Sequence, residues 1–192
     1  MKDSIRKYRS TDMIAVKQGV TAPDQIFGTF KEVKGNEAAL KYATAFATDD
    51  IKWCFLLIHG GVGNGKTHLC NAIARKMLAR GMNVQLYTAT KLLGKLRAAM
   101  NDKSTSMETV LTELKEVLVL IIDDLGVEYG SPWEKSTLED LLTSRWSMGM
   151  PTAVTTNLDP SQLPERIRSR FSDKKYARAV ANTAPDYRRT RR

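Results

Sequence analysis

Residues 60–67 read GGVGNGKT and match the pattern G-x-x-x-x-G-K-[ST] at every fixed position. The glycines let the backbone take positive φ angles and bring its N–H groups close to an anion. An apolar run, WCFLLIH at 53–59, is typical of a buried strand, and a helix is predicted at 66–79. The amino end of that helix adds a partial positive charge. A glycine-rich turn without a ligand is the alternative, but its neighbours favour a cradle for phosphate.

Such a cradle predicts a nucleotide site. Lys66 can reach the β- and γ-phosphates, and the Thr67 hydroxyl can bind Mg²⁺. The dinucleotide pattern G-x-G-x-x-G fails here, because the third residue after Gly63 is a lysine. The predicted nucleotide-binding residues are Gly60, Gly61, Val62, Gly63, Asn64, Gly65, Lys66, Thr67 and His68.

Strands and helices alternate along the rest of the chain. The further strands are expected at 84–88, 117–124, 152–156 and about 174–180, and the further helices at 37–48, 91–100, from 105, 131–148 and 161–171. Thr90, Thr105 and Ser131 are the expected helix caps, the last two in capping boxes. This alternation implies parallel strands with helical crossovers on both faces. We therefore predict an α/β fold with a five-stranded parallel sheet at 36–192, after a partly ordered N-terminal extension at 1–35 that could bind a partner.

Two carboxylates end the most apolar strand, LVLIIDD at 118–124. Because α/β folds bind ligands at the carboxyl ends of parallel strands, both should lie near the phosphate loop. Asp123 is predicted to bind Mg²⁺, and Asp124 to orient or deprotonate the attacking water. Asn157, after strand 152–156, is expected beside them, where its amide can bond the γ-phosphate or the water. A solvated turn is the alternative for the acids, and an ordinary turn residue is the alternative for Asn157.

Three arginines follow in PERIRSRF at 164–171. Arg166 and Arg170 are four residues apart and share a helical face. One could be an arginine finger, which completes the site of a neighbouring subunit and stabilises transition-state charge. That interpretation requires a homo-oligomer, and a solvated basic face is the alternative.

Composition favours a polyanionic partner. The 192 residues include 30 Lys and Arg against 21 Asp and Glu, which gives a net charge of +9. No apolar run approaches the roughly 18 residues of a membrane span, and residues 1–13 lack the apolar core of a secretory signal. Cys54 and Cys70 have no CxxC partner, so neither a zinc site nor a disulfide framework is expected. We expect a reducing cytoplasm and no membrane partner.

In order, these elements make the chain resemble a P-loop NTPase of the AAA+ class, a three-layer α/β/α fold. More narrowly, it resembles bacterial replicative helicase loaders of the DnaC/DnaI type and IstB-type transposition ATPases. The resemblance rests on GNEAALKYATAFATD, GVGNGKTHLCNAIA, LVLIIDDLG, TTNLDPSQLPERIRSRF and APDYRRTRR, and it covers residues 25–192. It implies ATP and Mg²⁺ as cofactors and no full C-terminal lid. It also implies Asp123 as the Walker-B acid, Asp124 as the catalytic acid, Asn157 as sensor 1, Arg170 as the arginine finger and Arg166 as an auxiliary arginine.

The resemblance also implies a DNA-facing insertion after strand 84–88. Its candidates are Tyr87 for base stacking and Lys91, Lys95 and Arg97 for phosphates, with Lys103 further on. An amphipathic helix with solvated lysines is the alternative.

The function implied by the resemblance is an ATP-dependent loader that grips single-stranded DNA and acts on a hexameric replicative helicase. Loaders usually carry an upstream helicase-gripping domain, whereas only about 35 loosely patterned residues come first here. A second hypothesis is an IstB-like helper that binds duplex DNA and recruits a transposase. A third is a nucleotide-dependent clamp on DNA or protein with little turnover.

Overall fold

A computed structural model describes residues 19–20, 22–48, 51–101, 104–126 and 131–187. Most of the expected N-terminal extension, Lys103 and the arginines of the last five residues lie outside the described residues. The boundary at residue 36 stays a prediction.

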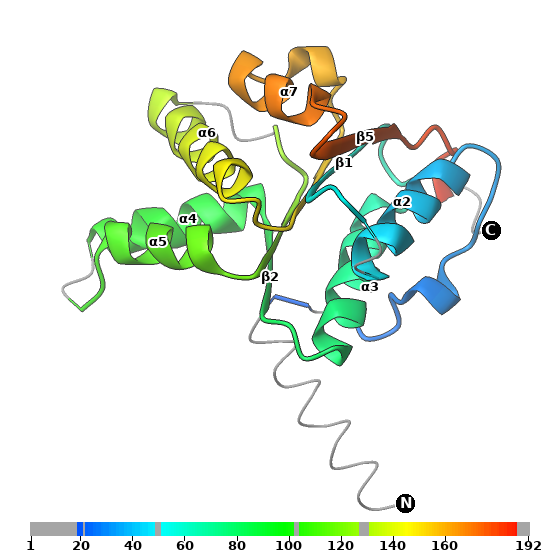
Figure 1. Ribbon diagram of the computed structural model, residues 1–192, viewed down its shortest axis with the longest axis horizontal. Coiled ribbons are helices and arrows are strands. Elements are labelled where there is room, and N and C mark those ends of the chain that lie inside the picture. The colour runs from blue at the N-terminus through cyan, green and yellow to red at the C-terminus, as the bar shows by residue number, and fades with distance from the viewer. Residues whose placement is uncertain (1–18, 21, 49–50, 102–103, 127–130, 188–192) are drawn as a thin grey trace, which may run out of the picture.

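Five parallel strands form one sheet in the order β2-β3-β4-β1-β5 (Figure 1). They are β1 Phe55–His59, β2 Val84–Thr88, β3 Val119–Asp123, β4 Thr152–Thr156 and β5 Ala177–Ala181. The α/β prediction is therefore confirmed. Neighbouring carboxyl ends of β3, β4 and β1 bring together the three segments expected to hold the nucleotide.

Helices cover both faces of the sheet (Figure 1). The chain carries α2 Glu37–Thr48, α3 Lys66–Ala79, α4 Ala89–Met100, α5 Met107–Glu116, α6 Pro132–Ser147 and α7 Glu165–Ser172, with short 3-10 helices η1 Phe27–Thr29 and η2 Pro160–Gln162. One apolar core packs α2 and α3 on the sheet, and a second packs α4 to α7 on the other face. Two cores on opposite faces make the three layers.

The starts of three helices differ from expectation. Thr88, rather than Thr90, caps α4 by accepting from the Lys91 N–H at 3.2 Å. Ser106, rather than Thr105, caps α5. Pro164 separates η2 from α7, because proline has no N–H and disfavours a helical residue before it. The capping box of Ser131 is confirmed.

Arg145 of α6 is fully buried and ties the second core together. Its five hydrogen bonds go to the carbonyls of Leu114, Lys115, Val117 and Pro151 and to the Thr152 hydroxyl, at 2.7–3.0 Å. Burial lowers the pKa of the guanidinium to about 10, so it stays charged at neutral pH. One side chain thus joins the end of α5 to the start of β4.

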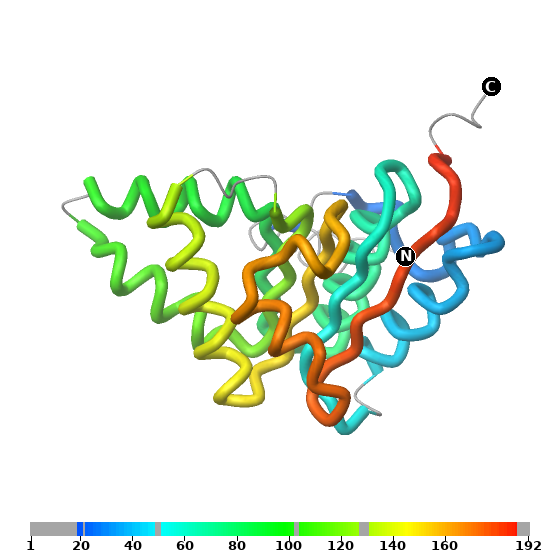
Figure 2. Tube along the Cα trace, turned by 90° about the horizontal axis from the view of Figure 1, so that it is seen from above, coloured from blue at the N-terminus to red at the C-terminus, as the bar shows by residue number. Residues whose placement is uncertain are grey.

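Helices α4 and α5 lie side by side and extend away from the sheet (Figures 1 and 2). Among the described residues, none of the helices is both long enough and apolar enough to cross a membrane.

Candidate nucleotide-binding site

The phosphate loop joins β1 to α3. Gly63 and Gly65 have φ of 75° and 94°, in the left-handed region that glycine tolerates. At Gly60, a Cβ would stand 2.0 Å from the Asn182 carbonyl oxygen. The loop therefore requires glycine for its turns and for its close contact with the chain after β5.

Lys66 is buried at the centre of this loop, with 6% of its surface exposed. Its Nζ donates to the carbonyls of Gly60 and Gly61 at 2.7 and 2.6 Å, and to Asn64 Oδ1 at 3.1 Å. The ammonium charge thus sits where the loop backbone curves around it. An anion in the loop would compete with the two carbonyls for the same donors.

Asp123, at the end of β3, faces the start of α3. Its carboxylate accepts from the Thr67 hydroxyl at 2.8 Å and from the Thr155 hydroxyl at 2.5 Å. The Cys70 thiol lies 3.6 Å from the same carboxylate, and its pKa is raised well above the ordinary value, by burial first and then by Asp123. The thiol thus stays protonated beside an acid that is 6% exposed.

The oxygens of Thr67 and Asp123 fit the preference of Mg²⁺ for hydroxyl and carboxylate ligands. Among the described residues, no group of three or more His, Cys, Asp or Glu side chains is arranged to hold a metal ion. This donor set therefore suits an ion that takes its other ligands from a bound phosphate and water.

Asp124 and Asn157 meet at the same edge of the sheet. The Asn157 amide donates to the Asp124 carboxylate. Asp124 has a φ of 61°, and its N–H donates to Thr155 Oγ1 at 3.0 Å. Since Thr155 also bonds Asp123, one buried hydroxyl orients both acids.

The sequence prediction missed two supporting residues. Thr155 could have been noticed as a polar residue in a strand expected to be buried. Asn182, just after β5, is fully buried and exchanges side-chain bonds with Asn64: its Nδ2 donates to the Asn64 carbonyl at 2.9 Å, and Asn64 Nδ2 donates to its carbonyl at 2.7 Å. No local pattern marks Asn182, because its partner lies in the phosphate loop.

A cavity of about 630 Å³ lies beside the phosphate loop. Residues from the N-terminal segment 24–36, the loop and the chain at 184–187 line it. His68 lines this cavity, with Nε2 2.9 Å from the Ile26 carbonyl and its ring edge-to-face with Phe30 at 5.2 Å. Ala184, Pro185 and Tyr187 of the C-terminal segment also line the cavity, and the Tyr187 N–H donates to the Gly63 carbonyl at 3.0 Å.

His59 ends β1 next to the loop. Its pKa is lowered, mainly by burial and also by Lys66, although Asp159 acts in the opposite direction. The imidazole is therefore biased towards its neutral form.

The predicted arginine finger lies on α7, away from the phosphate loop in sequence. The Arg170 guanidinium lies 4.5 Å from the centre of the Trp146 ring, and its Nε is buried without a hydrogen-bond partner. Arg166 is exposed. The finger and auxiliary roles of these arginines stay predictions.

Two of the candidate DNA residues contact one another. Lys95 Nζ lies 3.3 Å from the Tyr87 hydroxyl and 3.9 Å from a Glu113 carboxylate oxygen. Tyr87 also packs against the second core.

The other two candidates differ in their surroundings. Arg97 pairs with Glu134 and lies 5.4 Å from the Trp133 ring. Lys91 is exposed near the start of α4. DNA contact at these four residues stays a prediction.

Residues 22–173 match the bacterial DnaA ATPase domain family. The chain belongs to this family. This DnaA-type AAA+ ATPase domain is 28% identical over 144 residues to the replicative helicase loader DnaC of Escherichia coli K12. The aligned region covers 74% of this chain and 59% of the relative. The domain thus spans less than two thirds of that relative's length.

Solved structures agree on the fold. A crystal structure of DnaI matches with a TM-score of 0.66 and 26% identity, over 84% of this chain and 89% of the other. The replication initiator DnaA, bound to AMPPCP and single-stranded DNA, matches with a TM-score of 0.76 and 19% identity, over 85% of this chain and 51% of the other. The predicted AAA+ class is confirmed, and no helical lid follows β5 in the part of the chain described.

Proposed function

We propose that this domain is an ATP-dependent helicase loader or remodeller, which hydrolyses ATP, binds single-stranded DNA and acts on a hexameric replicative helicase. The observation that carries the ATPase part is the 2.8 Å contact between Thr67 and Asp123, which joins the phosphate loop to the end of β3. The similarity to DnaC supports the loader part.

In this proposal, Lys66 exchanges its bonds to the Gly60 and Gly61 carbonyls for phosphate oxygens. The loop N–H groups and the amino end of α3 bind the same phosphates. Thr67 and Asp123 would hold Mg²⁺, which when bound offsets the charge of the phosphates. The cavity lined by His68, Phe30 and Asn64 has room for the nucleoside.

Asp124 takes a proton from the attacking water, whose oxygen then bonds the γ-phosphorus. The bond from that phosphorus to the bridging oxygen breaks, and the products are ADP and phosphate. Asn157 positions Asp124 through the hydrogen bond that its side-chain amide donates to the carboxylate. General-base catalysis of this kind typically contributes about 10²- to 10⁴-fold to the rate.

The first experiment measures ATP turnover of the wild type, of Asp124→Asn, and of Asp140→Asn as a control on the exposed face of α6. We expect turnover to fall about 10²-fold or more in Asp124→Asn with ATP binding retained. Normal turnover in Asp124→Asn would show that another group is the base. Bound ATP without measurable wild-type turnover, with or without oligo(dT), would favour a clamp.

The loader part requires a separate experiment. Immobilised domain is incubated with a purified hexameric replicative helicase or with a transposase, each with ATP. Retention of the helicase alone supports the loader, whereas retention of the transposase alone supports an IstB-like helper. The same preparation, titrated with single-stranded and duplex DNA, should prefer single strands.

The predicted finger can be tested by mixing subunits. The Asp124→Asn subunit has an intact Arg170 but lacks the catalytic acid. The Arg170→Ala subunit has the catalytic acid but lacks the finger. If Arg170 acts on the neighbouring subunit, the mixture regains part of the turnover that each variant lacks. Arg166→Ala, mixed in the same way, should show a smaller defect.

A further inference from the structure

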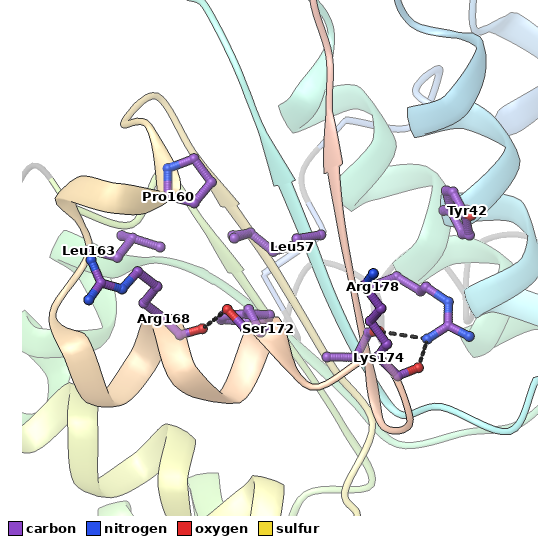
Figure 3. A pocket seen from close by; sticks show the side chains of 11 residues that line it. Tyr42, Leu57, Pro160, Leu163, Arg168, Ser172, Lys174 and Arg178 are labelled. Carbon is purple, nitrogen blue, oxygen red and sulfur yellow. Dashed lines mark hydrogen bonds between the residues drawn. The ribbon is translucent and has the colours of Figure 1, made fainter.

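A second cavity, of about 590 Å³, lies beside the edge strand β5 (Figure 3). Its floor is apolar and includes Leu57 of β1, Leu163 before α7 and Phe171 of α7. Leu163 and Phe171 are almost fully buried, and Leu57 is fully buried. We call this cavity the β5-edge groove. It lies away from the phosphate loop, and its use does not depend on the function proposed above.

The backbone of β5 is paired on one side only within the described sheet. The Tyr176 carbonyl and the Asn182 N–H bond the β1 segment. Since the bonding direction alternates along a parallel strand, Ala177, Ala179 and Ala181 turn their backbone groups away from β1. The Ala177 N–H donates to the Asp173 carbonyl at 2.8 Å, and the Ala177 carbonyl accepts from Arg178 at 2.7 Å. The groups of Ala179 and Ala181 therefore face the open edge.

Small side chains keep the groove open. Ala179 and Ala181 are both exposed, and Ala179 lines the groove. Successive strand residues point to opposite faces, so these alanines share the face of the buried Ala177, towards α7. A longer side chain at 179 would enter the space above Leu57.

Three cations border the groove: Arg168 on α7, Lys174 in the following turn and Arg178 on β5 (Figure 3). No carboxylate is among the described residues that line it. Two copies of this edge would bring like charges together, and charged edges of this kind disfavour self-pairing. An incoming strand with carboxylates matches the groove instead.

We propose that the β5-edge groove binds an extended acidic segment of a partner protein, which adds as a sixth strand beside β5. Backbone groups of Ala179 and Ala181 would pair with the segment, as in β-strand addition. Apolar side chains at alternate positions would enter the floor. The carboxylates between them would point to the opposite face, towards Arg178, and one near the turn after α7 would meet Lys174. An apolar floor and an unpaired strand edge suit a peptide better than a nucleic-acid backbone.

The test uses a fluorescein-labelled peptide of alternating Glu and Val, read by fluorescence anisotropy against the full chain. Ala179→Pro removes the outward N–H without removing a bond to β1, which is where edge strands tolerate proline. We expect it to weaken peptide binding at least tenfold. The double variant Lys174→Glu with Arg178→Glu should weaken binding by a similar factor, and Lys76→Glu on α3 should leave it unchanged. A Lys–Val peptide of equal length should not bind.

Ala179→Leu is a second test in case the proline variant misfolds, because leucine fills the groove but keeps the backbone N–H. Both variants should retain wild-type thermal melting and ATP binding. Failure of the wild type to bind the acidic peptide, or equal binding by wild type and Ala179→Leu, would overturn the proposal. Loss of oligo(dT) binding in the double variant without peptide binding would instead assign the groove to nucleic acid. A wild-type dimer that Ala179→Pro dissociates would assign it to a second copy.

Discussion

The phosphate-binding end of the sheet and the helical face built by α4 to α7 both carry buried or half-buried cations. At the phosphate end, Lys66 bonds carbonyls of its own loop, which an anion can replace. On the helical face, Arg145 bonds carbonyls from two segments, 114–117 and 151–152, and Arg170 stacks on Trp146. Lys66 is therefore held within one short turn, whereas Arg145 links separate parts of the fold.

This difference shows what makes a cation available to a ligand. Lys66 is 6% exposed and still faces the site, because the loop presents it there. Lys95 and Arg97 are more exposed, yet each already has an acidic partner and an aromatic ring beside it. The exposed fraction of a cation therefore does not by itself show whether it can bind a ligand. The groups that already bond the cation determine this.

The largest expected effect comes from breaking the helical face at its centre. Arg145→Met leaves four carbonyls and the Thr152 hydroxyl without this donor, and each buried polar group left unsatisfied costs about 1–3 kcal/mol. Urea denaturation should show this loss in the free energy of unfolding. Arg97→Met is the matched control, because exposed ion pairs contribute about 0–1 kcal/mol. Equal effects of the two substitutions would contradict the distinction.

A second prediction concerns the phosphate end. Asn182→Ala leaves the Asn64 carbonyl and the Ala184 N–H without partners, and each unsatisfied buried group costs about 1–3 kcal/mol. We expect a lower free energy of unfolding and ATP binding about tenfold weaker, because the Asn64 region of the loop loses its support. Titration with a fluorescent ATP analogue measures the affinity, and Asn101→Ala after α4 is the control. Unchanged affinity would mean that the loop keeps its shape without the C-terminal segment.

A third prediction compares two lysines on one helical face. Lys91 is exposed, whereas Lys95 is engaged by Tyr87 and Glu113. If this face binds single-stranded DNA, Lys91→Ala should reduce the slope of log K against log salt by about 0.7, as for one lost phosphate contact. Lys95→Ala should change the slope less. Oligo(dT) binding at several salt concentrations provides the measurement. A larger change of slope in Lys95→Ala than in Lys91→Ala would contradict this prediction and place the DNA beside Lys95.

The smallest effect is a pH dependence at the phosphate end. Because the pKa of His59 is lowered in the folded chain, the unfolded chain binds the proton more readily. The free energy of unfolding therefore falls as the pH drops below the ordinary histidine value of about 6.5. His59→Gln should show a smaller loss of stability between about pH 7.5 and about pH 5.5. An identical pH dependence in wild type and variant would rule out this contribution.

The sequence predicted the parts whose geometry is set locally. The phosphate loop, the five strands and the capping box of Ser131 follow from short patterns, and the structure has all of them. Asp123, Asp124 and Asn157 were expected together, because parallel strands end at one edge. Their contacts with Thr67 and with each other follow from the strand order.

What could not be predicted depends on contacts between distant segments. Asn182 supports the loop across 118 residues of sequence, and Arg145 bonds acceptors in two segments, 114–117 and 151–152. The acidic partner of Lys95 lies on α5, and that of Arg97 lies on α6. Composition and helical spacing identify Lys and Arg side chains on a helix face. Only the folded structure shows which of them already have hydrogen-bond or ion-pair partners.

The backbone at Asp124 limits which residues that position can accept. Its φ of 61° lies in the left-handed region, where glycine, asparagine and aspartate are far more common than other residues. Saturation mutagenesis at 124 would therefore rank variants by backbone compatibility before chemistry. An alanine there would lose the carboxylate and also introduce strain, so its activity would overstate the role of the acid. Asparagine keeps the shape and the conformation, which makes it the variant that isolates the charge.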